Sequence, residues 1–465
     1  MSRPTRYRVV VLTSLDRNQS VVTRNHRLKS VPPLMQELSK ERQQLLVDLQ
    51  ADAFNYFVNE VNTENGLVAD STKEGWPSSI AAVGMALAAY PIGVEHGFIS
   101  REEAIVRTLR KLRFFATGPQ SKAPDATGYK GFYYHFLDMK TGRRAWQCEL
   151  STVDSGFLFA GMLTAAAYFD RDSEDETEIR KLADTLYRRA DWRWATNGKA
   201  TLTHGWKPET GFLPYRWDCY DESLLMYILA LGSPTFSLPF ESYQAQSSAD
   251  LWRKVYDYEL LSAGPLFVHQ LSQVWLDLRG LQDALLRERG LDYFENSRRA
   301  TYVQQEYARR NPKGFAGYSE VCWGLTASEG PGPATKRIDG VDRVFFDYIA
   351  RGVPDGPDDG TVAPWAVVAS LPFAPEIVLP TLEHFEQMEI GTEQAYGLEA
   401  TFNPTFPDEQ CRKCGWLSPW HYGINEGPIV LMIENYRTEW LWRLMRTCPY
   451  IVNGLRRAGF NGGWL

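Results

Sequence analysis

Acidic residues stand beside aromatic residues at several places where apolar stretches of this sequence begin. Glu149 and Asp154 precede the apolar run 156–167, and Trp146 lies just upstream. Aromatic faces can stack on sugar rings, and two suitably spaced carboxyl groups can cleave a glycosidic bond. This pattern therefore indicates an enzyme that acts on carbohydrate.

A second acidic pair, Asp221 and Glu222, follows Trp217 and precedes the apolar run 224–231. A partly apolar wall raises the pKa of a carboxyl group toward neutrality, which suits a general acid. Glu222 is therefore our first choice for the group that protonates the leaving oxygen.

The group that activates water is expected on another segment. Asp154 is the first candidate for this base, and Glu149 and Glu426 are further candidates. The alternative is that these acids belong to helix starts, with Ser151 as the N-cap and Asp154 facing the positive end of the helix dipole. Both interpretations stay open for the sequence taken alone.

The candidates for binding substrate are aromatic and polar residues in the same stretches and in two Gly-rich segments. Each of them could instead pack a core or satisfy a structural hydrogen bond. The candidates for stacking on sugar rings are Trp76, Tyr134, Trp146, Trp206, Trp217, Trp323 and Trp420. The candidates for binding sugar hydroxyls are His135, Asp221, Glu320, His421 and Asn425.

Composition excludes several classes of partner. The net charge is −7 and no long basic run exists, which argues against nucleic acid. The sequence contains no uninterrupted run of about 18 apolar residues, so we expect no membrane span. The apolar run 9–12 is too short for a signal peptide, so we expect a cytoplasmic protein as the chain stands, or a periplasmic one if it is a processed form. The oligomeric state is not indicated.

No cofactor or metal site is predicted. Cys411 and Cys414 have metal-like spacing, but a zinc ribbon needs a second pair. A loop disulfide or two free thiols is the preferred interpretation. The acids of segment 355–360 lack the spacing of a calcium loop, and no His-Glu-x-x-His motif occurs.

The elements that must position these residues are expected to be mostly helices, because apolar residues recur at helical spacing along most of the chain. Segment 131–136 is the best strand candidate, and no linker or internal repeat is visible. We therefore expect an arm at 1–33 and one all-α domain at 34–465, built as an (α/α)6 toroid whose loops form a cleft at one end. Helices are expected at 34–61, 100–115, 150–169, 177–194, 221–231, 268–289, 292–310, 376–388, 428–446 and 449–458.

Several long segments resemble the bacterial glucoamylase-like domain of glycoside hydrolase family 144. The resemblance covers about residues 35–465 and implies an (α/α)6 barrel that hydrolyses β-1,2-glucan with inversion, either as an endo-acting or as a sophorose-releasing enzyme. It places the family's acidic cleft residues at Asp154 and Glu222, with Glu149 nearby. The segments that carry it are 76–84, 131–138, 149–154, 264–270, 292–299 and 432–436.

One departure from the family concerns the base. Members of that family carry Asp-Gln-Gly-Pro where this chain has Asn425-Glu-Gly-Pro428. Glu426 or another acid would have to take over the role of that Asp. We interpret the chain as an inverting β-1,2-glucan hydrolase. The alternatives are an (α/α)6 enzyme for another glycan, a lyase substrate included, or a non-catalytic glycan-binding protein.

Overall fold

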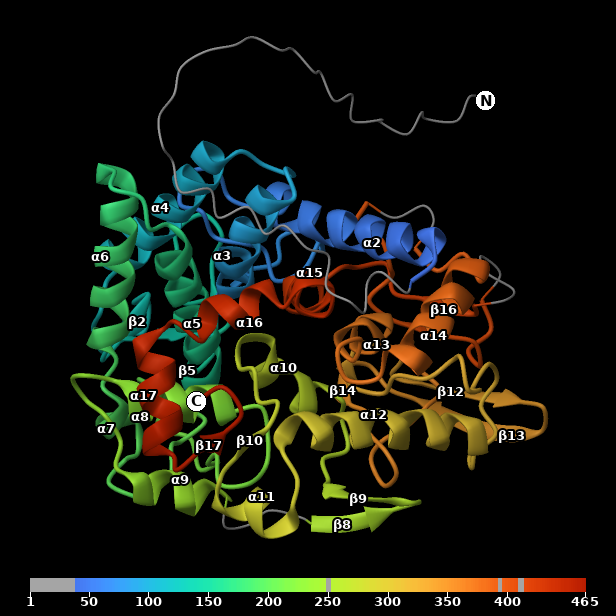
Figure 1. Ribbon diagram of the computed structural model, residues 1–465. Helices are drawn as coiled ribbons and strands as arrows, with labels where there is room; N and C mark the ends of the chain where they lie inside the picture. Colours follow the sequence, from blue (N-terminus) through green and yellow to red (C-terminus); the bar gives the residue numbers. More distant parts are fainter. Residues whose placement is uncertain (1–37, 248–251, 392–394, 409–413) are drawn as a thin grey trace, which may run out of the picture.

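The computed structural model describes residues 38–247, 252–391, 395–408 and 414–465, and it is rich in helices (Figure 1). The arm predicted at 1–33 lies outside the described residues. The helices are α2 (Lys40–Asn59), α3 (Ile80–Glu95), α4 (Arg101–Thr117), α5 (Thr152–Tyr168), α6 (Glu174–Arg189), α7 (Trp192–Ala195), α8 (Leu224–Gly232), α9 (Phe240–Gln246), α10 (Phe267–Trp275), α11 (Ala284–Arg289), α12 (Tyr293–Arg310), α13 (Pro364–Ala369), α14 (Pro375–Gln387), α15 (Gly423–Thr438), α16 (Trp440–Met445) and α17 (Pro449–Arg457).

The strands are short and pair antiparallel, and the largest sheet has the order β2-β3-β5-β6-β7. The predicted strand 131–136 is confirmed as β3 and the start of β4. The strands are β1 (Ser78–Ser79), β2 (Gly128–Tyr129), β3 (Phe132–Tyr134), β4 (Phe136–Leu137), β5 (Leu150–Ser151), β6 (Gly205–Lys207), β7 (Gly211–Phe212), β8 (Trp252–Val255), β9 (Tyr258–Leu261), β10 (Leu281–Gln282), β11 (Ala327–Ser328), β12 (Ala334–Ile338), β13 (Val341–Phe345), β14 (Ile349–Ala350), β15 (Phe402–Asn403), β16 (Trp416–Leu417) and β17 (Asn461–Gly462).

Several helix boundaries differ from the sequence prediction, and one of these differences affects the site. The helix predicted from Pro428 to Arg446 begins instead at Gly423, so Pro428 lies within its first two turns. It ends at Thr438, because Glu439 adopts a left-handed conformation with φ 56° and separates α15 from α16. The helix predicted over 268–289 is likewise interrupted and forms α10, β10 and α11.

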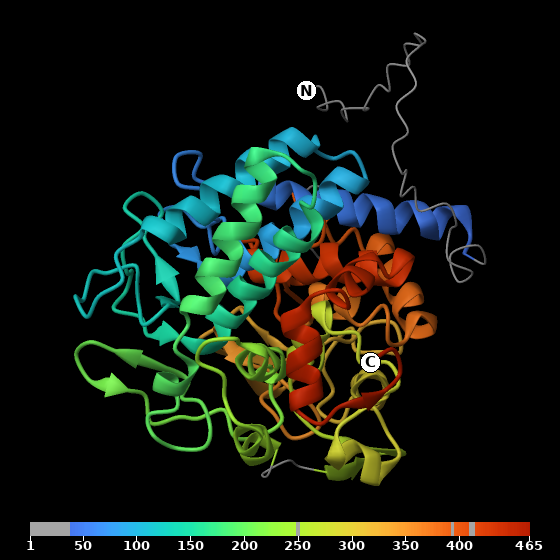
Figure 2. The ribbon, with the colours of Figure 1, turned by 60° about the vertical axis from the view of Figure 1, so that its left-hand side comes forward.

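The core is organised by helices that are apolar around their whole circumference. Almost every residue of α3 and α5 is buried, which is the pattern of a central helix. The amphipathic helices α4 and α6 pack on each other and on this pair, and they cover it toward the solvent (Figures 1 and 2). An inner pair of helices is thus covered by an outer pair.

Glycines allow α3 and α5 to approach closely. A Cβ atom added to Gly161 would lie 2.1 Å from the carbonyl oxygen of Gly84, and one added to Gly84 would lie 2.4 Å from that of Phe157. Both obstacles are backbone atoms, which cannot move without separating the helices. The interhelical distance therefore depends on these two positions.

We expect Gly161→Ala to lower the free energy of unfolding by about 1–3 kcal/mol, because the new methyl group must push two packed helices apart. Thermal or denaturant melting measures the change. Gly264→Ala is the matched control, since a Cβ there would meet no atom closer than 3.4 Å. A Gly161→Ala protein as stable as the control would show that the helix contact is not tight.

Candidate active site

A cavity of about 710 Å³ lies where the N-terminal ends of several helices meet. Asp154 comes from the first turn of α5, Glu222 directly precedes α8, and Asn425 lies in the first turn of α15. Residues at the starts of α10 and α13 line it as well. Helix N-termini carry partial positive charge, so this arrangement favours carboxylates inside the cavity.

Half of the predicted site residues line this cavity. Those that line it are Glu222, Asp154, Glu149, Trp76, His135, Trp146, Trp217 and Asn425. Among the described residues the remaining predicted ones lie outside the lining: Glu426, Tyr134, Trp206, Asp221, Glu320, Trp323, Trp420 and His421.

The aromatic residues outside the lining are held by protein groups. Trp323 is fully buried, and its indole N–H donates a hydrogen bond of 2.9 Å to the Thr381 hydroxyl. Tyr134 is also fully buried, with the Arg144 guanidinium over its ring. Neither ring is free to stack on a sugar.

Four more predicted residues lie outside the cavity lining. Trp206 packs its ring against Trp194. The Asp221 carboxylate accepts a hydrogen bond of 3.0 Å from the backbone N–H of Ser223, as a helix-start residue does. Half-buried Trp420 and the Glu320 side chain do not reach the cavity, whose lining is drawn from the described residues.

Glu426 was expected to take over the role of the Asp that Asn425 replaces, but its side chain does not line the cavity. It is buried, and one of its carboxylate oxygens lies 3.0 Å from Nδ1 of His421. Because α15 begins at Gly423, residues 425 and 426 lie on different faces of its first turn, about 100° apart. The side chain of Asn425 therefore meets the cavity, while Glu426 and His421 form a buried pair behind it.

His135 joins two acids on one wall of the cavity. Its Nδ1 atom lies 2.8 Å from Oε1 of Glu149, and its Nε2 atom lies 3.6 Å from Oδ2 of Asp154. Burial lowers the pKa of His135, but the charges of Asp154 and Glu149 outweigh it and raise this pKa to about 9. Burial raises the pKa of Glu149, and the hydrogen bond from His135 outweighs it and lowers this pKa to about 2. The His135 imidazolium and the Glu149 carboxylate are thus the charged forms at neutral pH.

The start of α5 fixes Asp154. The Ser151 hydroxyl accepts a hydrogen bond of 3.2 Å from the backbone N–H of Asp154 and donates one of 2.5 Å to its carboxylate. Ser151 is therefore the N-cap, as the helix-start interpretation predicted. The same residue also lines the cavity, so the capping and the cavity interpretations both hold for this segment.

Glu222 is held in the opposite protonation state. Burial, followed by the charges of Asp221 and Asp154, raises the pKa of Glu222 to about 8. Trp217 also lines the cavity, and its indole N–H donates a hydrogen bond of 3.0 Å to the Thr152 hydroxyl. The cavity thus holds a neutral carboxyl group close to charged carboxylates at pH 7.

Sequence reasoning did not select several polar residues of the cavity. Asp70 accepts a hydrogen bond of 3.1 Å from the Trp76 indole, and burial raises the pKa of Asp70 to about 6. Glu329 accepts a hydrogen bond of 2.7 Å from the Tyr422 hydroxyl. Glu329 shares its Gly-rich loop with the predicted Glu320, and no local signal distinguishes the two. Lys73, His204, Asp347 and Tyr348 complete this group.

The residues that were considered as metal ligands in the sequence bind other protein groups where the structure describes them. Cys414 is disulfide-bonded, while Cys411 lies outside the described residues. Asp358 accepts hydrogen bonds from the hydroxyls of Tyr307 and Tyr318, and Asp359 pairs with Arg351. Within the described ranges no cluster of three or more His, Cys, Asp or Glu residues could hold a metal ion. Of the described helices, none is long and apolar enough to cross a bilayer.

One protein family and several individual proteins are similar to this chain. The sequence profile of the family described as "Glycoamylase: Putative glucoamylase" matches residues 214–449, more than half of the chain. A curated relative is the "Exo beta-1,2-glucooligosaccharide sophorohydrolase (non-reducing end)" of Parabacteroides distasonis, 28% identical over 451 residues. That match covers 89% of this chain, and the chain spans 58% of the length of that relative.

Solved structures of related proteins are also similar to this chain. The structure of a "putative glucoamylase" from Bacteroides uniformis is 31% identical, with a TM-score of 0.80, and the match covers 92% of this chain and all of that one. The endo-β-1,2-glucanase of Chitinophaga pinensis, solved with sophorotriose and glucose, is 26% identical with a TM-score of 0.79. That match also covers 92% of this chain and all of the other.

We expect Glu222→Gln to raise the melting temperature at pH 8 and to leave it unchanged at pH 4. The pKa of Glu222 is raised from 4.5 to about 8, so between these values the unfolded chain releases a proton that the folded chain keeps. Wild-type stability therefore falls with rising pH across this window, and the amide removes this loss. Melting curves at several pH values measure the difference. Glu241→Gln, at an exposed position of α9, should show no such dependence; equal curves for both variants would contradict the raised pKa.

Proposed function

We propose that this chain, which belongs to the glucoamylase-like family (glycoside hydrolase family 144), is an inverting hydrolase of β-1,2-linked glucan. The relatives described above support the linkage, because one is named as a sophorohydrolase of β-1,2-glucooligosaccharides and another as an endo-β-1,2-glucanase. The substrate is an oligo- or polysaccharide, and the reaction needs no cofactor.

The observation that carries the proposal is the contrast in protonation within one cavity. Burial keeps Glu222 neutral at pH 7, whereas His135 keeps Glu149 ionised and places its Nε2 atom 3.6 Å from Oδ2 of Asp154, the proposed base. A glycosidase needs a carboxyl group that still has its proton and a carboxylate that can accept one. The two different environments within this cavity supply a protonated carboxyl group and an ionised one.

In the proposed reaction Glu222 donates its proton to the glycosidic oxygen, which leaves with the electron pair of the breaking C–O bond. Asp154 accepts a proton from the water that attacks the anomeric carbon from the opposite face. The serine cap and His135 hold this carboxylate in place. Glu149 is then the partner that keeps His135 charged and oriented, and Asp70 adds a further acid to the same cavity.

Aromatic residues on the cavity wall suit a sugar chain. Trp146 is 55% exposed and meets the ring of Trp76 edge-to-face, with centroids 4.6 Å apart. Trp217 and Glu222 line the same cavity. Flat apolar faces next to carboxyl groups can bind the C–H faces of glucose units while the acids reach the bond between them.

The architecture that we propose is a single domain over residues 34–465 in the form of an (α/α)6 toroid. The inner pair α3 and α5 inside the outer pair α4 and α6, and the convergence of helix N-termini on one cavity, support this arrangement. A toroid gathers its loops at one end, where a cleft for a long polymer can form.

We expect Glu222→Gln to lower kcat/KM by about a hundredfold or more, the scale of a lost general acid, while the fold persists. In the wild type, kcat/KM should fall as pH rises through about 8, because only the protonated Glu222 can donate. Steady-state kinetics between pH 5 and 9 measure both effects, with Glu241→Gln as a control of unchanged activity. Near-normal turnover of a folded Glu222→Gln protein would remove this residue from the mechanism.

We expect linear β-1,2-glucan to be cleaved and starch to remain intact. A single displacement by water at a β-linkage gives the α-anomer at the new reducing end. A panel of purified glucans, NMR of the first products and sizing of the released chains test these points together. Sophorose as the only early product indicates exo action, and longer mixed products indicate endo action. An initial β-anomer would contradict inversion, and glucose from starch alone would contradict the linkage.

A further inference from the structure

The segment between β13 and β14 brings an exposed tyrosine to the catalytic cavity. Asp347 and Tyr348 both line the cavity. Tyr348 is 70% exposed, more than any other large apolar or aromatic side chain in the described part of the protein. Within those same ranges its hydroxyl has no hydrogen-bond partner. A large ring that is exposed to solvent and not hydrogen-bonded is available to a ligand.

The Tyr348 ring lies close to the proposed catalytic acids. Burial between the cavity walls, followed by the charges of Asp70, Glu222 and Asp154, raises the pKa of Tyr348 to about 12. These acids come from three separate segments, and all of them line the same cavity as Tyr348. The ring is accessible to solvent within the cavity, and a substrate that enters the cavity can therefore contact it.

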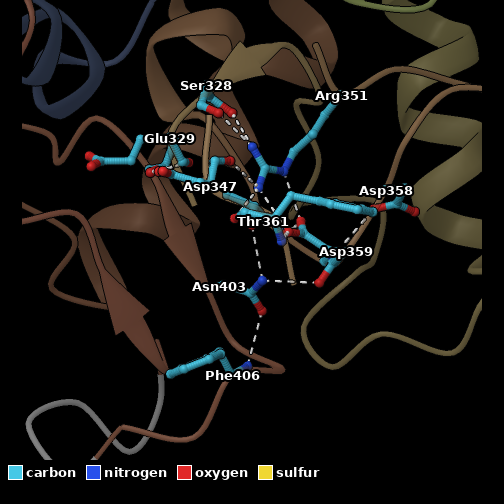
Figure 3. A network of polar contacts seen from close by, with 12 residues as sticks. Ser328, Glu329, Asp347, Arg351, Asp358, Asp359, Thr361, Asn403 and Phe406 are labelled. Atoms are coloured by element: carbon cyan, nitrogen blue, oxygen red, sulfur yellow. Dashed lines mark hydrogen bonds and ion pairs between the residues drawn. The ribbon is translucent and has the colours of Figure 1, made fainter. Parts of the chain in front are cut away.

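A buried arginine holds this segment in place (Figure 3). The Arg351 side chain is fully buried, and its Nε and Nη2 atoms lie 2.8 Å from the two carboxylate oxygens of Asp359. Nη2 also donates to the carbonyl oxygens of Phe346 and Asp347, at 3.1 and 3.2 Å. Nη1 donates to the carbonyl oxygen of Ser328 at 2.5 Å. One guanidinium thus joins two segments of the cavity wall.

The surrounding residues complete this arrangement. Asp359 accepts a hydrogen bond of 2.9 Å from the backbone N–H of Phe346, and Asn403 donates one of 3.0 Å to the Asp359 carbonyl (Figure 3). Gly330 leaves the space for the guanidinium, since a Cβ there would lie 2.1 Å from Nη2. A buried ion pair is a poor source of stability because of its desolvation cost, so its contribution here is to geometry.

We propose that Tyr348 binds substrate by stacking on a glucose unit beside the catalytic acids, and that Arg351 is the positioning residue that fixes it there. This proposal rests on the proposed function and extends it to a segment far along the chain from the motifs that carry the acids. Asp347, exposed at the same edge, offers its carboxylate to the hydroxyls of that glucose unit.

The test measures binding of linear β-1,2-gluco-oligosaccharides by calorimetry in a Glu222→Gln parent, which does not consume the probe. We expect Tyr348→Ala to weaken binding by about two- to tenfold, the scale of one aromatic contact. Tyr348→Phe keeps the ring and should stay within about twofold of the parent. Val344→Ala changes an exposed residue of the same hairpin outside the cavity lining and should bind as the parent does.

Arg351 is tested by coupling, which a merely structural role would not produce. Arg351→Met combined with Asp359→Leu removes both charges together, and it should weaken binding about as much as Tyr348→Ala. Adding Tyr348→Ala to this pair should then cost little more, because the ring is already displaced. If the pair fails to fold, Gly330→Ala provides the same readout by crowding the guanidinium.

The outcomes separate the two proposals. Parental affinity in Tyr348→Ala would overturn the role of Tyr348 and leave the proposed function intact. Strictly additive losses would overturn the positioning role of Arg351. A parent that binds no β-1,2-gluco-oligosaccharide, with an active enzyme that leaves every β-glucan uncleaved, would overturn the proposed function and this inference with it.

Discussion

The contact between His135 and Glu149 is the interaction on which the charge pattern of the cavity depends. Three carboxyl groups, those of Asp70, Glu149 and Asp154, act on this one imidazolium. Without its positive charge these acids would repel one another. The small sheet secures the contact, since the backbone N–H of His135 donates to the carbonyl oxygen of Glu149 at 3.0 Å. A few short strands in a helical protein thus determine which acids are charged.

The helices contribute a second condition, because their N-termini meet at the same cavity. The positive N-terminal end of α5 lies at Asp154, whereas burial keeps Glu222, just before α8, neutral. Neutral and charged acids can therefore line the same cavity. The cavity walls add tryptophan and tyrosine faces, so the means of binding a sugar and the means of cleaving its linkage come from the same few segments.

The sequence predicted the parts of the site that are fixed locally. Asp154 and Glu149 lie within one turn of a serine cap, so their position follows from the helix start, and the family resemblance pointed to the same segment. Tyr134 and Trp323 were misplaced because an aromatic residue has the same local pattern in a core and in a cleft. Asp70 and Tyr348 reach the cavity only through tertiary packing, which no local pattern encodes. Glu426 was misplaced because α15 starts five residues before Pro428, and this changes the face on which each residue of its first turn lies.

Ser151 belongs to two elements at once, and this restricts how the segment can evolve. It pairs with Tyr133 and Gly205 as the last residue of β5, and it caps α5. One inserted or deleted residue between Glu149 and Asp154 would turn the acid by about 100° around the helix or flip the strand. Lineages can therefore exchange side chains in this stretch but cannot change its length. Exposed turns such as 197–199, which hold no cavity residue, are where insertions can accumulate without loss of the enzyme.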